Sequence, residues 1–303
     1  MSGKDMISKQ YKSKKTSVKK SDKKEIESKI YLDSHIVTSI YDKKNVLLIG
    51  KVGSGKTHSV LHIFQDMKNK NLIDEVIELT FVTGMDDYDL LSKFSPSVDG
   101  KLKIIDGQIE KAFRLASEGK RVAVLLDELT RIPAKSLNIL ISILDKVRNK
   151  YVLNNFIKGE VVECQTQNLF FVATANLGRN FEGTFNLDEA ILDRFEKITY
   201  VDYSTELEYD LIKQKFPKIT SNQMLEITSE IQTLRQGSKE NLFESPFSTR
   251  LLKYVLSDML TPTRTEFKRV VMESVIYRLL PKNLDGSPMM GNLELIYGIE
   301  NDK

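Results

Sequence analysis

The residues with the clearest chemical potential are Gly-Lys-Val-Gly-Ser-Gly-Lys-Thr, from Gly50 to Thr57. They fit the pattern G-x-x-x-x-G-K-[ST], in which glycines let backbone N–H groups surround a phosphate. An apolar run precedes the loop and an amphipathic run follows it, so the start of a helix adds its dipole to the same anion site. We expect Lys56 to reach the β- and γ-phosphates of a nucleotide and Thr57 to be a Mg²⁺ ligand. A chance match in a Gly/Lys-rich turn is the alternative, and this context argues against it.

A second candidate is the apolar run Val122–Leu126, which ends in Asp127 and Glu128. It predicts a buried strand whose acidic residues emerge at the carboxyl edge of a parallel sheet, where ligands bind. Asp127 is expected to hold Mg²⁺, directly or through water, and Glu128 to polarise the attacking water as a general base. Such a run is common by itself. Its position about seventy residues after the phosphate loop favours function.

Two further polar residues follow apolar runs. The run from Phe170 ends at Asn176, whose amide would contact the γ-phosphate and orient water, or would only cap a loop. Arg194 follows the helical run 187–192, and we expect it to stabilise charge on the nucleotide of a neighbouring subunit as an arginine finger. A surface ion pair, for instance with Asp193 or Glu196, is the alternative for Arg194.

A fifth candidate, Arg250, lies near the start of a predicted helix in the C-terminal region. It would contact the nucleotide from a lid domain, unless it is an ordinary helix-surface arginine. His58 and His62 have the i, i+4 spacing of metal ligands, but no third ligand is evident, and no metal site is expected there. The expected nucleotide-binding set is Gly50, Val52, Gly53, Ser54, Gly55, Lys56, Thr57, His58, Asp127 and Arg250.

Alternating strand and helix patterns position these residues. Apolar runs bounded by polar residues predict five strands, and amphipathic periodicity predicts helices between them. This alternation favours an α/β fold with a parallel five-stranded sheet flanked by helices. The expected strands are 45–49, 76–81, 122–126, 169–173 and 198–201, and the expected helices are 58–68, 109–118 and 135–148.

Two segments read as hairpin insertions, 95–108 and 151–168, the second with its turn at 154–155. After residue 203 helical patterns dominate, at 205–216, 222–235, 247–259 and 264–280, which indicates a small all-helical lid domain. The predicted organisation is a disordered basic tail over 1–28, an α/β nucleotide-binding domain over 29–203, the lid over 204–282 and an irregular tail over 283–303.

Composition limits the setting. The 303 residues are 41% hydrophobic, with no apolar run long enough for a membrane span and no secretory signal. A single cysteine, Cys164, favours a reducing, cytoplasmic location. The net charge of +3 combines +7 in residues 1–24 with −4 in the remainder. The tail is therefore expected to solubilise the protein or to dock on an acidic partner, nucleic acid or an anionic surface.

Taken in order, these elements resemble AAA+ ATPases over about residues 35–280. In that resemblance Walker A is Gly50–Thr57, Walker B is Leu125–Glu128, sensor 1 is Asn176, the arginine finger is Arg194 and sensor 2 is Arg250. The chain is most similar to the MoxR/AAA_5 group, including CbbQ, NorQ and GvpN relatives. The segments that carry this likeness are 84–91 with the following hairpin, 126–131, 173–176, 181–184 and 187–195. Leu177 departs from the family, where many relatives carry Pro, as does the basic tail.

The resemblance implies a P-loop NTPase fold that binds ATP and Mg²⁺ and forms a hexameric ring. It also implies remodelling of a client protein, in many relatives through a von Willebrand factor A-domain adaptor. A McrB-like nucleic-acid motor is one alternative, but the acidic body and the lack of a DNA-reading domain argue against it. A nucleotide-gated scaffold with little turnover is another, and the presence of Glu128 and Arg194 argues against that.

Overall fold

The computed structural model describes residues 31–96, 102–176, 188–283, 287 and 289. The predicted tail 1–28 and most of 283–303 lie outside these residues. Contacts divide the chain into an α/β unit, residues 30–204 with 248–250, and a helical unit, residues 205–247 with the described residues after 250. No helix in the described ranges is both long and apolar enough to cross a membrane.

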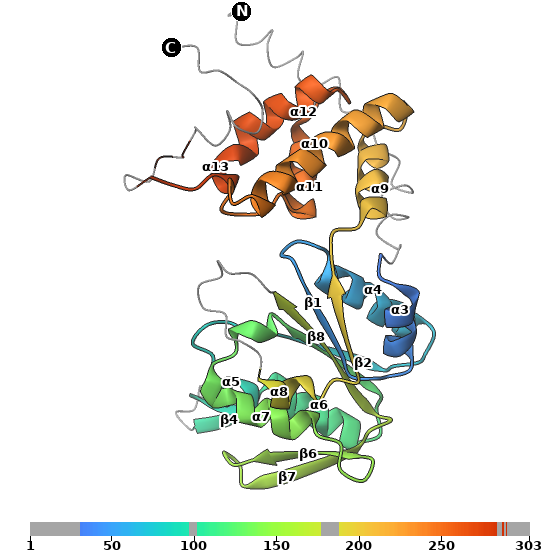
Figure 1. The fold of residues 1–303 in the computed structure, drawn as a ribbon. Coiled ribbons are helices and arrows are strands. Elements are labelled where there is room, and N and C mark those ends of the chain that lie inside the picture. Colours follow the sequence, from blue (N-terminus) through green and yellow to red (C-terminus); the bar gives the residue numbers. More distant parts are fainter. Residues whose placement is uncertain (1–30, 97–101, 177–187, 284–286, 288, 290–303) are drawn as a thin grey trace, which may run out of the picture. The chain divides into compact units, whose positions relative to one another are not determined.

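A five-stranded, all-parallel sheet forms the centre of the α/β unit, in the order β2-β5-β8-β1-β9 (Figure 1). The three middle strands are almost entirely buried, which explains their continuous apolar sequence. The predicted fold class is confirmed, and each predicted strand has a counterpart. The strands are β1 (Val46–Gly50), β2 (Glu75–Thr80), β5 (Val122–Asp127), β8 (Leu169–Asn176) and β9 (Lys197–Val201).

Helices cover both faces of this sheet (Figure 1). On one face, α3 (Ser34–Tyr41) and α4 (Lys56–Asn69) bury apolar side chains against the strands. On the other, α6 (Gln108–Ser117) and α7 (Ala134–Leu144) pack in the same way. Helix α3 was not predicted, because its eight residues hold only two buried apolar side chains, Ile36 and Ile40.

The predicted helix 135–148 is wrong at its end, because α7 stops at Leu144. Asp145 adopts an extended backbone conformation, and Arg148 and Asn149 have positive φ angles. Val147, which lies inside the predicted helix, instead forms a bridge with Lys150 and is exposed.

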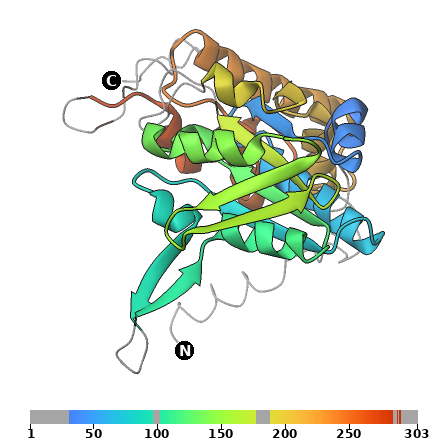
Figure 2. The same ribbon diagram turned by 90° about the horizontal axis from the view of Figure 1, so that it is seen from below.

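Both expected hairpins are present and lie on the α/β unit (Figure 2). The first consists of β3 (Ser92–Pro96) and β4 (Leu102–Asp106), and the second of β6 (Lys150–Asn155) and β7 (Glu160–Gln165). The turn predicted at 154–155 is wrong by about two residues. Asn155 is still in the strand, and its side-chain oxygen accepts hydrogen bonds from the N–H groups of Ile157 and Lys158, which makes 156–159 the turn.

Three short elements connect the larger ones: α5 (Asp87–Leu90), a 3₁₀ turn (Leu129–Arg131) and α8 (Glu189–Leu192). The helical unit contains the expected helical segments, and the last is broken by a π-helical turn, Val271–Val275. Its helices are α9 (Thr205–Lys215), α10 (Ser221–Lys239), α11 (Thr249–Asp258), α12 (Arg264–Val270) and α13 (Ile276–Leu279).

Candidate functional site

The phosphate loop connects β1 to α4, and its glycines have local physical causes. Gly55 is the N-cap of α4 and has a left-handed backbone, with φ of 90°, which glycine adopts without a steric penalty. A Cβ on Gly50 would lie 2.0 Å from the Val201 carbonyl oxygen of the neighbouring strand β9. Both glycines of G-x-x-x-x-G thus have a structural cause apart from any ligand: Gly50 lies against strand β9, and Gly55 adopts a left-handed backbone.

Lys56, at the start of α4, is a buried cation surrounded by oxygen acceptors. Its Nζ donates to the carbonyl oxygens of Gly50 (3.1 Å) and Lys51 (2.8 Å) and to Oδ1 of Asn176 (2.9 Å). Burial lowers the pKa of Lys56 to about 8, although the nearby carboxylates of Glu128 and Asp127 oppose the shift. A lysine held in this way can exchange its acceptors for phosphate oxygens without moving far.

Thr57 and Asp127, the two expected Mg²⁺ ligands, are in contact. The Thr57 hydroxyl donates to Oδ1 of Asp127 at 2.7 Å. The hydroxyl of Thr174 donates to the same oxygen and accepts a hydrogen bond from the Glu128 N–H. No group of three or more His, Cys, Asp or Glu side chains suited to a metal occurs in the described parts of the chain. Mg²⁺ bound by Thr57 and Asp127 would therefore take its other ligands from phosphate oxygens and water, which is how Mg²⁺ is commonly held.

Glu128 stands at the carboxyl end of β5 with a left-handed backbone, φ 60°. Such a conformation costs a non-glycine residue about 1 kcal/mol or more and is frequent at functional sites. Its Oε2 accepts hydrogen bonds from Nδ2 of Asn176 (2.7 Å) and Nε of Arg131 (3.2 Å). Asn176 thus connects the two residues: its side-chain oxygen accepts from Lys56, and its side-chain nitrogen donates to Glu128.

The sheet order explains why these side chains converge. Strand β8 lies between β5 and β1, and its register pairs Gly50 with Asn176 and Leu126 with Ala173. The ends of three parallel strands therefore meet at one edge, as the sequence predicted. Sequence reasoning gave no role to Thr174 or Arg131, which hold Asp127 and Glu128. A threonine two residues before Asn176 in an apolar strand was the available signal for Thr174.

The remaining members of the predicted nucleotide-binding set lie on or next to the loop. Ser54 is buried, Val52 accepts a hydrogen bond from the Tyr203 hydroxyl at its carbonyl oxygen, and His58 is exposed on α4 with its ring edge-on to His62. Arg250 is exposed near the start of α11. Its contact with a nucleotide stays a prediction.

Arg194 is absent from the hydrogen-bonded group that contains Lys56, Asn176 and Glu128. Its Nε lies 3.4 Å from Oδ1 of Asp145, the residue after α7, so the chain forms an ion pair of the kind that the sequence left open as the alternative, with another partner. Its backbone carbonyl accepts a hydrogen bond from the side chain of Asn45 (3.4 Å). Arg194 is therefore held from the side of α7 and the start of β1.

A family model matches most of the α/β unit. Residues 45–195 match the AAA domain of the dynein-related subfamily, AAA_5. No curated protein matches the chain. A candidate ATPase from Cytophaga hutchinsonii, of known structure, is 19% identical, covers 84% of this chain and 78% of its own, and has a TM-score of 0.45. PCH-2 of C. elegans is 17% identical over 84% of this chain and 65% of its own, also with a TM-score of 0.45.

Proposed function

We infer that this chain, which carries an AAA domain of the dynein-related subfamily, is an ATPase that assembles into a ring and remodels a partner protein. The observation that carries the proposal is the convergence of the five predicted site residues Lys56, Thr57, Asp127, Glu128 and Asn176 at one edge of the sheet. Lysine, a hydroxyl, two carboxylates and an amide are the groups that phosphoryl transfer to water requires.

Each residue has a role that follows from its contacts. Lys56 exchanges its carbonyl acceptors for β- and γ-phosphate oxygens and offsets their charge. Thr57 and Asp127 hold Mg²⁺, which neutralises charge on the phosphates when bound. Asn176 contacts the γ-phosphate through its amide and keeps Glu128 nearby. Glu128 accepts a proton from the attacking water, whose oxygen forms the new bond to phosphorus as the bond to the β-phosphate oxygen breaks.

The proposal also concerns the assembly of the chain into a ring and the protein on which the ring acts. We propose that Arg194, which pairs with Asp145 within its own chain, exchanges this ion pair for the nucleotide of a neighbouring subunit. We further propose a hexamer of the MoxR-like type in the cytoplasm, with Arg250 reporting nucleotide state from the lid. The client is a protein, bound directly or through a von Willebrand factor A-domain adaptor.

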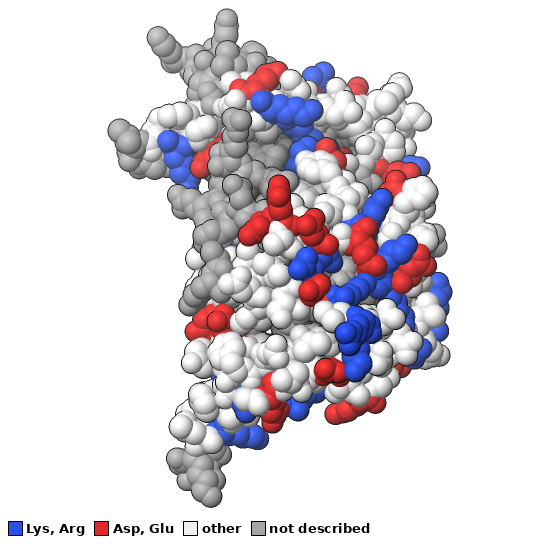
Figure 3. Space-filling model, turned by 60° about the horizontal axis from the view of Figure 1, so that its bottom comes forward, with Lys and Arg blue, Asp and Glu red and all other residues white. Residues whose placement is uncertain are grey.

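Surface charge does not favour the nucleic-acid alternative. On the face shown in Figure 3, acidic and basic side chains are mixed and no basic field covers the described residues. A motor that grips nucleic acid needs a positive groove, because phosphate contacts provide most of its affinity. This face therefore gives no support to a nucleic-acid motor, which stays an alternative to the proposal.

The proposal is tested by comparing Glu128→Gln with Lys56→Ala. Glu128→Gln should still bind ATP but should lower turnover by on the order of 10²–10⁴, the usual contribution of a general base. Lys56→Ala should lose nucleotide binding itself. Binding is measured with a fluorescent ATP analogue and turnover by phosphate release.

The matched control is Lys68→Met, which removes an exposed lysine of the same helix α4, paired with Glu75. It should behave as the wild type in both assays. Tight ATP binding by Lys56→Ala would refute the phosphate-loop assignment, and unchanged turnover in Glu128→Gln would refute the base.

A further inference from the structure

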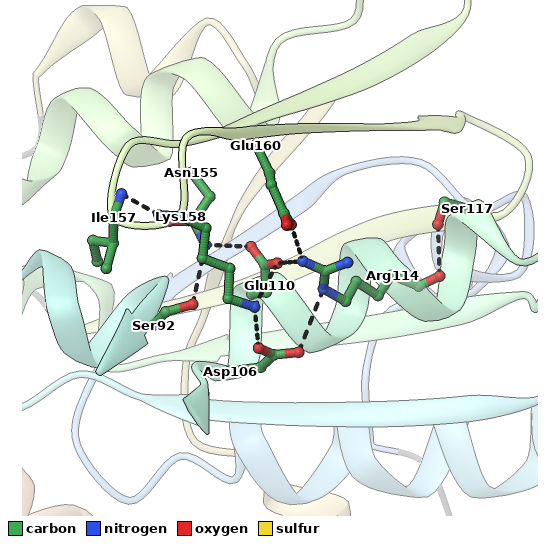
Figure 4. A network of polar contacts seen from close by, with 9 residues as sticks. All are labelled: Ser92, Asp106, Glu110, Arg114, Ser117, Asn155, Ile157, Lys158 and Glu160. Carbon is green, nitrogen blue, oxygen red and sulfur yellow. Dashed lines mark hydrogen bonds and ion pairs between the residues drawn. The ribbon is translucent and has the colours of Figure 1, made fainter. Parts of the chain in front are cut away.

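Glu110, in the first turn of α6, is a fully buried carboxylate that lies outside the nucleotide site. Figure 4 shows it at the centre of a polar network. One carboxylate oxygen accepts a hydrogen bond from Nδ2 of Asn155 (2.7 Å). The other lies 3.3 Å from Nζ of Lys158 and 2.5 Å from Nη2 of Arg114. A buried carboxylate is costly without partners. The three donors around Glu110 offset that cost and connect separate segments of the chain at this residue.

Glu110 is connected to the first hairpin through its partners: Asn155 and Lys158 belong to the second hairpin and in turn contact the first. Asn155 ends β6, and its amide also donates to Oγ of Ser92, the first residue of β3 (3.0 Å). Lys158, in the turn of the second hairpin, also pairs with Asp106, the last residue of β4. Both strands of the first hairpin are thus bonded, at the base of the hairpin, to the second hairpin: β3 through Ser92 and β4 through Asp106.

Arg114 closes the network one turn further along α6. Its guanidinium lies 3.4 Å from Asp106 of the first hairpin and also pairs with Glu160, the first residue of β7. Two cations, Lys158 and Arg114, therefore face three carboxylates, those of Asp106, Glu110 and Glu160. Both cations contact Asp106 and Glu110, and Glu110 is the fully buried one of these two shared partners, so a change at Glu110 removes the buried half of the arrangement.

We propose that Glu110 is a positioning residue that fastens the β3–β4 hairpin to the β6–β7 hairpin, so that the two move as one body. The second hairpin is anchored in the core by Tyr151 and Leu153, which are fully buried. Among the described residues of the first hairpin no apolar side chain is buried: all five residues of β4 are exposed, and the buried residue of β3 is the polar Ser92. The orientation of this hairpin is therefore set at its base, through Glu110, rather than by packing along its length.

The fastened hairpin presents an apolar face. The register pairs Phe94 with Ile104 and Pro96 with Leu102, and opposed residues of an antiparallel pair share a face. The side chains of Phe94 and Leu102 are 53% and 73% exposed. Figure 2 shows this hairpin, in teal, projecting from the α/β unit. Its use against a client rests on the proposed function, whereas the fastening by Glu110 does not.

The test is amide hydrogen exchange of the full chain without nucleotide, read by mass spectrometry. Glu110→Gln keeps the size of the side chain and removes the charge that Lys158 and Arg114 share. Exchange should accelerate in 92–96, 102–106 and 150–165 together, on the order of tenfold, the factor expected when a charge-assisted hydrogen bond is lost. Strands β5 and β8 should keep their wild-type rates and serve as the internal reference.

The matched control is Lys150→Met, which breaks an exposed ion pair with Glu163 between β6 and β7. This ion pair lies on the second hairpin and contacts neither Glu110 nor the first hairpin. It should leave 92–106 unchanged. If Glu110→Gln does not fold, Lys158→Met gives the same comparison from the turn of the hairpin. Acceleration confined to one hairpin, or equal in variant and control, would overturn the proposal.

A second readout measures the coupling directly. Spin labels at Lys103→Cys on β4 and Val161→Cys on β7 replace two exposed side chains, while the native Cys164 is buried and unreactive. The distance distribution between the labels should be narrow with Glu110 and at least twofold broader with Glu110→Gln. An unchanged width would count against fastening. Neither measurement depends on ATP, so loss of the ATPase proposal would leave both outcomes interpretable.

Discussion

At the scale of single residues, the state of Lys56 makes ATP binding sensitive to pH. Burial lowers the pKa of its ammonium to about 8 in the free protein. Triphosphate oxygens favour the charged form, so binding raises this pKa again. Above about pH 8, binding must therefore take up a proton, and affinity should fall as the pH rises from about 8 towards the ordinary pKa of 10.5. Titration calorimetry in buffers of different ionisation enthalpy measures both the affinity and the proton uptake.

Lys56→Arg is the control, because a guanidinium stays charged throughout this range. If it binds ATP, its affinity should not depend on pH. Equal wild-type affinity at about pH 7 and pH 9.5 would contradict the role given to Lys56. The stability of the folded chain should change with pH in the opposite direction to ATP affinity. The unfolded chain binds more protons at this group, so the free energy of unfolding should increase from about pH 8 to 10.5.

The sequence predicted which candidate residues lie together where their spacing alone identifies them. Glycines, lysine and threonine in the loop, and polar residues at strand ends, follow from backbone geometry and parallel strand order. Thr174 contacts Asp127 from the neighbouring strand, and Arg131 contacts Glu128 three residues earlier in the same turn. Such contacts depend on rotamers and register, which no periodicity in a single sequence encodes.

At the scale of elements, Asn45 connects several segments of the α/β unit. Its buried Oδ1 accepts hydrogen bonds from the Phe171 N–H of β8 and the Tyr151 hydroxyl of β6, both at 3.1 Å. Asn45→Leu would leave both donors buried without an acceptor. Since each such donor costs about 1–3 kcal/mol, the free energy of unfolding should fall by roughly 2–5 kcal/mol. Urea denaturation followed by circular dichroism measures it.

Asn168→Ala is the comparison, because the Asn168 amide makes one hydrogen bond, to the Ala116 carbonyl, in a half-buried position. It should cost about 1 kcal/mol. If the two variants lose the same stability, Asn45 does not join these elements in the way described.

The elements were predicted well where one kind of burial extends along the chain. Strands β5 and β8 are buried throughout, so their apolar runs were sufficient. Prediction failed where a residue has another structural role than its type and position in the sequence suggest. Val147 fits the helical period of α7, yet its backbone forms a bridge with Lys150, the first residue of β6. Asn155 resembles a turn residue, yet it ends β6 and bonds Glu110.

At the scale of the whole molecule, the proposed ring makes each active site the product of two chains. The phosphate loop would come from one subunit and Arg194 from the next. Loss of such a finger costs on the order of 10³ or more in rate. Arg194→Ala alone should therefore bind ATP normally and turn it over slowly, which distinguishes it from Lys56→Ala, in which binding fails.

Mixing these two inactive variants tests whether Arg194 acts on a neighbour. In a mixed ring, an Arg194→Ala subunit keeps its phosphate loop and can receive Arg194 from an adjacent Lys56→Ala subunit. With equal amounts and random assembly, roughly a quarter of the interfaces would be complete. Phosphate release should rise towards that fraction of the wild-type rate. Lys56→Ala mixed with Glu128→Gln is the control, because both changes lie on the same side of the interface and no complete site can form. Rescue in the first mixture alone would establish action in trans, whereas silence in both mixtures would refute it.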